Sequence, residues 1–484
     1  MMRAYQVVEH GRLKLLLLAM IVNSAAAFAE KSWLAGDHHI HSQFSPGYDF
    51  SVNPPRLIIG GDAVNSLPTN ATLAKKYGLS WIVGTDHGGP NHSKINRDMA
   101  YPELLKSRKE VPEVIQFYGM EFNTPGADHS SLIIPYTEDE QHVLFKLEHG
   151  FDKLEVFPVD VSRDVENNML AGLAVMAALP SPPVVIANHP SRTATAYGEY
   201  GADDPAEFRR WNDTAPNVAV GMAGAPGHQA IALAGEAIKK TFATSKKPLK
   251  LSRGVYLGYP TLGGFDQMTA RVGGFWDSML GEGRRWWITS NSDFHRHHSD
   301  EGVDFYPGEY SKTFVYAEKK HDAILAALRS GQVFVTTGDL VSEAYVTVRH
   351  KKAEASIGGE LVVDQGSTVQ IEIRVRDPDK KNSNGSNPTL SRIDLIVGNV
   401  GEKSVDLRIN SNSSTRVLTR FTSNIWTRTG EFLTMRTTLV TNESMYLRVR
   451  GTNTDELEPS EDPAGENPWD DLWFYTSPIF VTTR

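Results

Sequence analysis

Residues 71–87 read Ala-Thr-Leu-Ala-Lys-Lys-Tyr-Gly-Leu-Ser-Trp-Ile-Val-Gly-Thr-Asp-His, and this stretch indicates the fold class. Its first seven residues are typical of a helix, which we expect to end at Gly78, a residue suited to a helix C-cap. A short apolar strand, Trp81 to Gly84, follows at once and leads into Asp86 and His87. A helix that runs directly into a buried strand is the repeating unit of α/β proteins.

The same alternation of helices and apolar strands continues from about residue 30 to 340, which predicts one large α/β domain. Further helices are expected near Met169 to Leu179 and from Asp322 to Arg329. The other apolar strands that we expect here are Val114–Tyr118, Val184–Ala187 and Trp286–Thr289.

The pattern changes after about residue 345. Residues 369–375 alternate strictly between apolar and polar side chains, as in a strand with one buried face and one solvated face. The segments Ile393–Val397 and Tyr446–Arg450 read in the same way, and turn-forming residues separate the first two strands. We therefore expect residues 345–484 to form an all-β, sandwich-like domain without helices.

The first 29 residues have the features of a secretory signal peptide. Basic residues Arg3, Arg12 and Lys14 precede the apolar run Leu15–Val22, and Ala27-Phe28-Ala29 fits the cleavage pattern. The run is shorter than a membrane span, and no later segment approaches about 18 apolar residues. We therefore expect a periplasmic or secreted protein with no membrane span in the mature chain; the alternative is an uncleaved anchor.

Composition narrows the chemistry. The 484 residues contain no cysteine, so disulfides, thiolate metal ligands and a cysteine nucleophile are excluded, and any metal must be held by imidazole and carboxylate groups. The formal net charge of −9 gives no electrostatic reason to expect nucleic acid or an acidic membrane surface as a partner. The length exceeds what one core usually organises, which favours two domains, residues 30–340 and 345–484.

The segment Asp37-His38-His39-Ile40-His41-Ser42 is the first candidate metal-binding motif. If it is a strand, its period of two places Asp37, His39 and His41 on one face and His38 on the other. Two imidazoles on one face can then bind a single ion. An isolated pair of this kind is weak evidence, because paired histidines also occur on ordinary surfaces.

Metal-ligand residues recur where the expected strands end. The end of an α/β strand is where barrel enzymes place their chemistry. Any one such residue could be an ordinary polar side chain, but repetition at successive strand ends favours a shared site. The residues in these positions are His87, Glu121, His189, Asp293 and His295.

His129 precedes the apolar run Ser131–Ile134 and could face the same site from the start of a strand. Asp86 and Asp128 are adjacent to proposed ligands. They could accept a hydrogen bond from the free ring nitrogen of a ligating histidine, or they could simply cap a turn.

Taken in order, these motifs resemble the PHP (polymerase and histidinol phosphatase) superfamily of metal-dependent phosphoesterases, over most of residues 33 to 300. The segments 313–316 and 333–338 are similar to an exported branch that includes carbaryl-hydrolase-type enzymes and carries a C-terminal β-domain. The resemblance implies a distorted (β/α)7 TIM-like barrel that holds two or three divalent ions.

Carried over position by position, the resemblance implies eight metal ligands and makes Glu121 a candidate bridge between ions; we count Glu121, Asp293 and His295 as catalytic. Family members usually have an Asp soon after the first motif, but here Ser45 is followed by Pro46. Asp49 is then either a ninth ligand, or the site binds only two ions tightly. The eight implied ligands are His39, His41, His87, Glu121, His129, His189, Asp293 and His295.

Nitrogen and oxygen ligands without thiolate suit Zn, Mn or Fe ions, and the sequence does not choose among them. Two such ions would supply a metal-bound hydroxide as the nucleophile, so that no protein nucleophile is required. For the substrate, Arg192 and Arg296 could pair with an anionic group, and His228 could line the pocket.

Three functions remain open at this stage. A phosphoesterase acting on a small-molecule ester is favoured by the superfamily resemblance, and a carboxyl- or carbamate-ester hydrolase is favoured by the nearest branch. An apolar slot for the latter could be lined by Trp276, Trp286 and Trp287, although such residues usually belong to the core. The third alternative is a non-catalytic metal-bound binding protein. The oligomeric state is not given by the sequence.

Overall fold

The structure is a computed structural model that describes residues 30–227, 256, 259–296, 305–462 and 467–484. Residues Lys31–Arg484 form one compact unit. The expected signal peptide and His228 lie outside the described residues. Within the described part of the chain, none of the helices has both the length and the apolar character that a membrane crossing requires.

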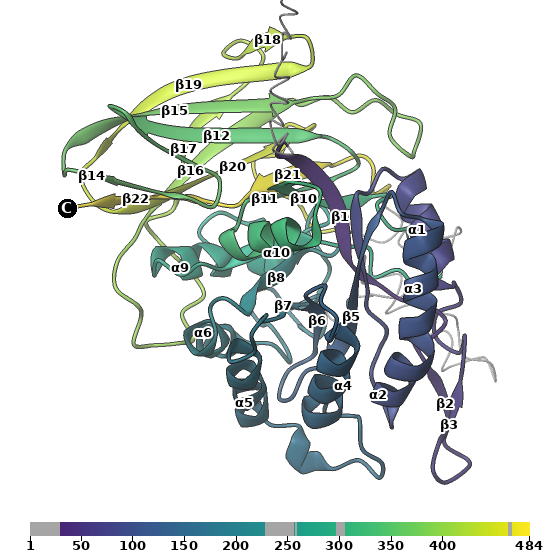
Figure 1. Ribbon diagram of the computed structural model, residues 1–484. Helices are drawn as coiled ribbons and strands as arrows, with labels where there is room; N and C mark the ends of the chain where they lie inside the picture. The colour runs from purple at the N-terminus through teal and green to yellow at the C-terminus, as the bar shows by residue number, and fades with distance from the viewer. Residues whose placement is uncertain (1–29, 228–255, 257–258, 297–304, 463–466) are drawn as a thin grey trace, which may run out of the picture. The chain divides into compact units, whose positions relative to one another are not determined.

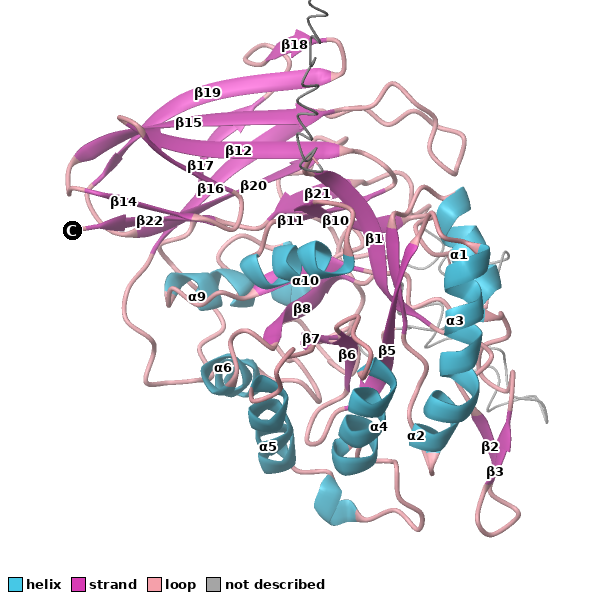
Figure 2. Ribbon diagram, viewed as in Figure 1, coloured by secondary structure: helices cyan, strands magenta, loops and turns pink. Residues whose placement is uncertain are grey.

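The amino-terminal two thirds of the unit contain the strands at one end of a large sheet, together with the helices that connect them (Figures 1 and 2). Neighbouring strands follow the order β1-β4-β5-β6-β7-β8-β9. The pairings β1–β4, β4–β5, β7–β8 and β8–β9 are parallel. The strand bounds are β1 Ser32–Ile40, β4 Trp81–Gly84, β5 Ile115–Asn123, β6 His129–Ile134, β7 Val184–Ala187, β8 Ala219–Ala225 and β9 Trp287–Ser290.

Strand β6 departs from the expected strand–helix alternation, because it lies antiparallel between β5 and β7. Residues 124–128 connect β5 to β6, which is too short for the crossover that a parallel pair needs. The turn is closed by a hydrogen bond of 3.2 Å from the amide of Thr124 to the carbonyl oxygen of Asp128. As a result His129 lies directly opposite Asn123, close to Glu121.

The two ends of this strand series also approach each other. The amide of His41 donates to the carbonyl oxygen of Phe294 over 2.8 Å, and Ile40 and Phe294 form an isolated parallel bridge. The amide of Ser290 donates to Oγ1 of Thr313, in the strand beside β1, over 2.7 Å. The segments that follow β1 and β9 are therefore neighbours.

Helices connect most of these strands. Helix α1 shows why they begin where they do: the Ser66 side chain accepts a hydrogen bond from the amide of Thr69, and Pro68 occupies the first turn. Helix α3 packs against β5, and α6 packs against β8. The helix bounds are α1 Leu67–Lys76, α2 His92–Ile95, η1 Asn96–Ala100, α3 Tyr101–Glu110, α4 Glu140–Phe151, η2 Val161–Arg163, α5 Glu166–Ala177, α6 Pro205–Thr214, α8 Gln267–Ala270, α9 Phe275–Gly281 and α10 His321–Ser330.

The C-terminal part of the chain is built from strands, and the large sheet continues into it. Strands β10 and β11 follow β1 in the sheet, and β11 pairs with β21. A separate sheet has the order β13-β12-β15-β19-β18. The bounds are β10 Ser311–Ala317, β11 Val333–Thr337, β12 Glu343–His350, β13 Ala353–Ser356, β14 Glu360–Val363, β15 Ser367–Arg376, β16 Arg392–Asn399, β17 Arg416–Phe421, β18 Thr427–Thr429, β19 Phe432–Thr441, β20 Met445–Thr452, β21 Trp473–Thr476 and β22 Ile479–Thr483.

Most element predictions are confirmed within a few residues. The alternating segment 369–375 lies in β15, with its apolar side chains buried. The expected strand at Val114–Tyr118 is β5, which extends to Asn123. Glu121 therefore lies inside a strand rather than after it. A short hairpin, β2 Gly47–Asp49 with β3 Arg56–Ile58, had no counterpart among the expected elements.

Candidate metal centre

The carboxyl end of β1 places His39 and His41 side by side. Both side chains are fully buried, and their Nε2 atoms lie 2.9 Å apart. His38 faces elsewhere, with its ring nitrogens 3.0 Å from Oγ of Ser131 and 2.8 Å from Oγ1 of Thr289. As the strand periodicity predicted, His38 points away from His39 and His41, whose side chains meet.

A carboxylate from β5 and one from the segment after β9 meet this pair. His39 Nε2 lies 3.1 Å from Oε1 of Glu121 and 3.1 Å from Oδ1 of Asp293. His41 Nε2 lies 3.1 Å from the same Asp293 oxygen. Ligand atoms bound at 2.0–2.1 Å to one ion are separated by about 3.0–3.4 Å, so these four residues are spaced as ligands of a shared ion.

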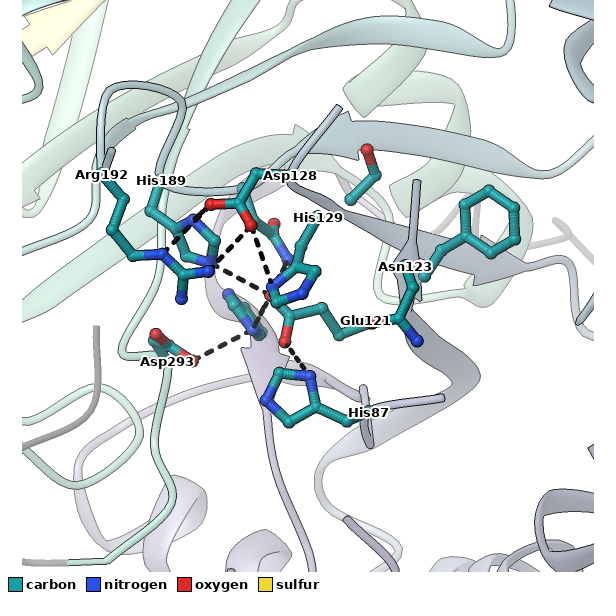
Figure 3. A network of polar contacts seen from close by, with 12 residues as sticks. His87, Glu121, Asn123, Asp128, His129, His189, Arg192 and Asp293 are labelled. Carbon is teal, nitrogen blue, oxygen red and sulfur yellow. Dashed lines mark hydrogen bonds and ion pairs between the residues drawn. The ribbon is translucent and has the colours of Figure 1, made fainter. Parts of the chain in front are cut away.

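Glu121 is also the meeting point of three further histidines (Figure 3). Its Oε2 lies 2.8 Å from Nδ1 of His87. Its Oε1 lies 3.2 Å from Nδ1 of His129 and 3.1 Å from Nε2 of His189. This single buried carboxylate thus contacts side chains from four different segments, which is the arrangement expected of a bridging ligand.

Asp62 is a member of the cluster that the sequence did not reveal. Its Oδ2 lies 3.3 Å from Nε2 of His295 and 3.7 Å from Nε2 of His87. Asp49, the residue expected in this role, lies on the β2–β3 hairpin, where it pairs with Arg56 over 2.9 Å and accepts hydrogen bonds from Ser51. The acidic residue that joins the histidines is therefore Asp62 and not Asp49.

These side chains form three overlapping groups, each with ligand atoms close enough to hold one ion. The first and second groups share His41, the second and third share Glu121, and the third and first share His87. His189 joins through its contact with Glu121. The groups are His41, Asp62, His87 and His295; His39, His41, Glu121 and Asp293; and His87, Glu121 and His129. We refer to all these residues together with His189 as the metal-ligand cluster.

In two of the histidines, hydrogen bonds to the outer ring nitrogen fix which nitrogen faces the cluster. The Ser45 hydroxyl donates to Asp62, so it accepts from Nδ1 of His41 at 3.0 Å, and Nε2 of His41 is left unprotonated. Nδ1 of His295 lies 2.8 Å from the carbonyl oxygen of Asp293 and must donate to it. Such outer contacts are usual for histidines that bind metal.

Two members of the cluster have unusual backbone conformations. His189 has a φ of 29° and Asp293 a φ of 48°, in the left-handed region that residues with side chains seldom adopt. Surrounding contacts hold both turns: Asp37 accepts from the amides of His39 and Ser292, and Asp266 accepts from the amide and hydroxyl of Ser191. Strain of this kind is typical of functional sites.

The electrostatic environment favours the ligand forms of His41 and Glu121, whereas burial and Arg192 oppose the charge of His189 but its contacts with Asp128 and Glu121 raise its pKa to about 9. Burial lowers the pKa of His41 well below its usual value, and His295 and His87 lower it further. Burial would raise the pKa of Glu121, but the neighbouring His39, His129 and His87 hold it well below its usual range. Neutral imidazoles and ionised carboxylates are the ligand forms.

The donor set fits divalent ions. Oε2 of Glu121 is buried and has no hydrogen-bond partner among the described residues, although His87 Nδ1 is 2.8 Å away. These two atoms approach each other without hydrogen-bond geometry, as metal-ligand atoms do when both point to the same ion. With nitrogen and oxygen ligands and no sulfur, the cluster can hold Zn, Mn or Fe ions.

The residues expected around the ligands have different environments. Asp128 accepts a two-pronged hydrogen bond from Arg192, at 3.1 and 2.8 Å, and lies 3.5 Å from Nδ1 of His189. Asp86 instead binds the amide and hydroxyl of Ser42 and caps that turn. Arg296 donates to backbone carbonyl oxygens of residues 60–62.

Comparisons with known proteins add little. A scan against models of protein families finds no match, and neither does a search of curated proteins. Among solved structures, the chain is similar to a candidate metal-dependent phosphoesterase from Bifidobacterium adolescentis, with 12% identity, a TM-score of 0.17 and coverage of 32% of this chain and 67% of that chain.

Proposed function

We propose that this chain is an exported metal-dependent phosphoesterase of the PHP type that holds two or three divalent ions in the metal-ligand cluster. The observation that carries the proposal is the convergence of buried imidazole and carboxylate groups on Glu121. Bound ions would activate water as the nucleophile and stabilise developing negative charge. A protein nucleophile is then unnecessary.

Arg192 supports an anionic substrate. Its Nε and Nη2 atoms bind Asp128, and Figure 3 places its guanidinium group between Asp128 and Asp293. The side chain is 22% exposed. A guanidinium group fixed by one carboxylate at the edge of the cluster can present its remaining N–H groups to a phosphate oxygen.

A carboxyl- or carbamate-ester hydrolase is the second candidate. The three tryptophans Trp276, Trp286 and Trp287 are buried in the core and leave no slot for a substrate. Other aromatic residues lie beside the segment that follows His87: the Tyr48 ring lies against Gly89, and Phe50, which is 64% exposed, lies between the rings of Tyr48 and Phe157. This apolar edge is the observation that favours an aryl ester.

A substrate panel decides between the candidates. The purified protein, loaded with Mn²⁺, Zn²⁺ or Fe²⁺, is assayed with p-nitrophenyl phosphate mono- and diesters and with naphthyl esters and carbamates. We expect turnover of phosphate esters, lost together with bound metal in His39→Ala and Asp293→Ala while the fold persists. Turnover of naphthyl substrates alone would favour the second candidate, and no turnover by the metal-loaded protein would favour a binding protein.

The proposal also includes the architecture and the location. We propose that β1 and β4–β9 belong to a distorted PHP-type barrel, followed by an accessory β-sandwich. The approach of the segments after β1 and β9 supports this arrangement. For export, the sequence of residues 1–29 is the support; mass spectrometry of the protein from the periplasm should give a new amino terminus at residue 30.

A further inference from the structure

A chain of buried polar side chains connects three strands of the large sheet to the metal-ligand cluster. Thr289 comes from β9, His38 from β1, Ser131 from β6, and Asn188 from the segment that follows β7. All four residues are at most 3% exposed. Buried polar groups are costly unless they are hydrogen-bonded, so a continuous polar chain in this position requires an explanation.

The contacts along the chain are short and connect directly to Glu121. His38 Nε2 lies 2.8 Å from Oγ1 of Thr289, and its Nδ1 lies 3.0 Å from Oγ of Ser131. The Ser131 hydroxyl lies 2.9 Å from Oδ1 of Asn188. Nδ2 of Asn188 then donates to Oε1 of Glu121 over 3.1 Å.

The chemistry of the partners favours one direction for the hydrogen bonds along this chain. Glu121 as a carboxylate can only accept, so the Asn188 amide must turn its NH₂ group toward it and its oxygen toward Ser131. Ser131 has one proton, which faces only acceptors: Oδ1 of Asn188 and the carbonyl oxygen of His38. His38 Nδ1 then donates to Ser131, and Nε2 of a neutral His38 accepts from the Thr289 hydroxyl, which is 2.8 Å from it and 3.3 Å from the carbonyl oxygen of Met222.

All donors thus point toward Glu121, from Thr289 through His38 and Ser131 to Asn188. We propose that Asn188 is a positioning residue for Glu121, held in a single amide orientation by the chain Thr289-His38-Ser131. The inference rests on the proposed function, since it assigns Glu121 as a ligand of the bound ions. It adds a residue that acts on the site without touching an ion.

The amide of Asn188 differs from the other groups near Oε1 of Glu121. His39, His129 and His189 approach this oxygen through ring nitrogens that ions would engage, and a nitrogen engaged in this way cannot donate a hydrogen bond. An amide NH₂ group is not a metal ligand. The Asn188 contact would therefore persist with ions bound and keep the Glu121 carboxylate in the orientation that the structure shows.

The test measures metal affinity in Asn188→Ala and Asn188→Asp by titrating the metal-free protein with Mn²⁺, without substrate. Both variants should bind about 10–100-fold more weakly than the wild type, the range for residues that orient ligands. Asn188→Asp should be at least as weak as Asn188→Ala, because aspartate matches the shape of asparagine but cannot donate to Glu121. If Asn188 acted only by filling its space in the core, Asn188→Asp would reduce Mn²⁺ affinity less than Asn188→Ala, and that result would overturn the proposal.

Ser131→Ala tests whether the chain acts through Asn188. It should weaken Mn²⁺ binding less than Asn188→Ala does, and the double variant Ser131→Ala/Asn188→Ala should bind Mn²⁺ no more weakly than Asn188→Ala alone. Losses of Mn²⁺ affinity that add up in the double variant would show that Ser131 does not act through Asn188. The matched control is Ser107→Ala, which removes a similar buried bond of 2.6 Å from Ser107 to Gln116, far from the cluster along β5; it should leave Mn²⁺ binding unchanged.

The unfolding temperature of each metal-free variant separates positioning from a general loss of structure, and it should be similar for Ser131→Ala and Ser107→Ala. Wild-type protein that binds no Mn²⁺ would overturn the proposed function together with this inference. Wild-type protein that binds Mn²⁺, beside an Asn188→Ala variant that binds it equally well, would overturn the positioning role alone.

Discussion

Oδ2 of Asp62 lies 3.3 Å from Nε2 of His295, although the two residues come from opposite ends of the α/β region. The next residue, Arg296, donates to the carbonyl oxygens of Asp62 and Gly61 over 2.9 and 3.0 Å. The segment after the β2–β3 hairpin and the segment after β9 thus hold each other, through a side-chain contact within the cluster and through backbone contacts beside it.

Asp62→Asn should remove part of the bound metal. An amide keeps the shape of the side chain but loses the negative charge that stabilises a cation near His295 and His87, so we expect lower metal content by mass spectrometry and activity reduced by at least about tenfold. Asp49→Asn is the matched control, because Asp49 pairs with Arg56 on the hairpin. Metal loss in Asp49→Asn with retention in Asp62→Asn would restore the assignment made from the sequence.

Arg296→Gln should weaken metal binding without changing recognition of the substrate. The guanidinium group makes its hydrogen bonds to the backbone carbonyls of residues 60–62, so its loss loosens the segment that carries Asp62. We expect a higher dissociation constant for the metal, an unchanged KM at saturating metal, and activity restored by excess Mn²⁺. An increased KM with unchanged metal affinity would instead support the substrate contact that the sequence suggested.

The sequence predicted most members of the metal-ligand cluster for a physical reason that these contacts make plain. His39 and His41 alternate on a strand, and His189 and Asp293 directly follow short apolar strands, so local periodicity and strand ends were sufficient to place them. Glu121 was found although the extent of its strand was wrong, because a residue three positions beyond the expected end at Tyr118 still reaches the same end of the sheet.

Asp62 could not be predicted in the same way. It follows the hairpin β2–β3 and a turn, and the apolar run Leu57–Ile59 before it lies on or beside that hairpin, with Ile58 and Ile59 exposed, rather than in a core strand. Its position depends on Ser45, His295 and the backbone contacts of Arg296, which are remote in sequence. The polar chain from Thr289 to Asn188 was missed for a related reason: each member is an ordinary polar residue, and only their packing reveals one network.

Arg192→Gln should affect anionic substrates selectively. Because the guanidinium group lies at the edge of the cluster and is already oriented by Asp128, its removal should raise KM for p-nitrophenyl phosphate by about tenfold, which corresponds to about 1.4 kcal/mol. KM for a neutral naphthyl ester should change little if that substrate is turned over at all. Equal increases for both substrates would show that the residue acts by shaping the pocket and not by its charge.

Removal of metal should lower the stability of the protein. The cluster buries several carboxylates and imidazoles, and ions that bind only the folded state stabilise it by about 2.7 kcal/mol when present at 100 times their dissociation constant. We expect EDTA to lower Tm of the wild type, with recovery on adding Mn²⁺. His39→Ala serves as the control, since its Tm should hardly respond to EDTA; an equal response in both proteins would contradict metal binding at this site.

Stability should also decrease at alkaline pH through His92, a buried residue outside the cluster. Its Nδ1 lies 2.7 Å from Oε1 of Glu148 and its Nε2 lies 2.9 Å from the carbonyl oxygen of Phe44. Since both partners are acceptors, both ring nitrogens must carry protons, and the imidazole is positively charged. Burial opposes this charge, but Glu148 raises the pKa of His92 to about 9.

The direction of the pH effect follows from this raised pKa. Below the ordinary histidine pKa of about 6.5, the folded and unfolded chains both hold the proton, and the full stabilisation is present. Between about 6.5 and 9 only the folded chain holds it, so stability falls by at most about 1.4 kcal/mol per pH unit. Tm of the metal-loaded wild type should therefore decline across this window. His92→Gln, which cannot titrate, should start from a lower Tm and decline less steeply than the wild type; parallel curves for the two proteins would show that His92 is not charged in the folded state.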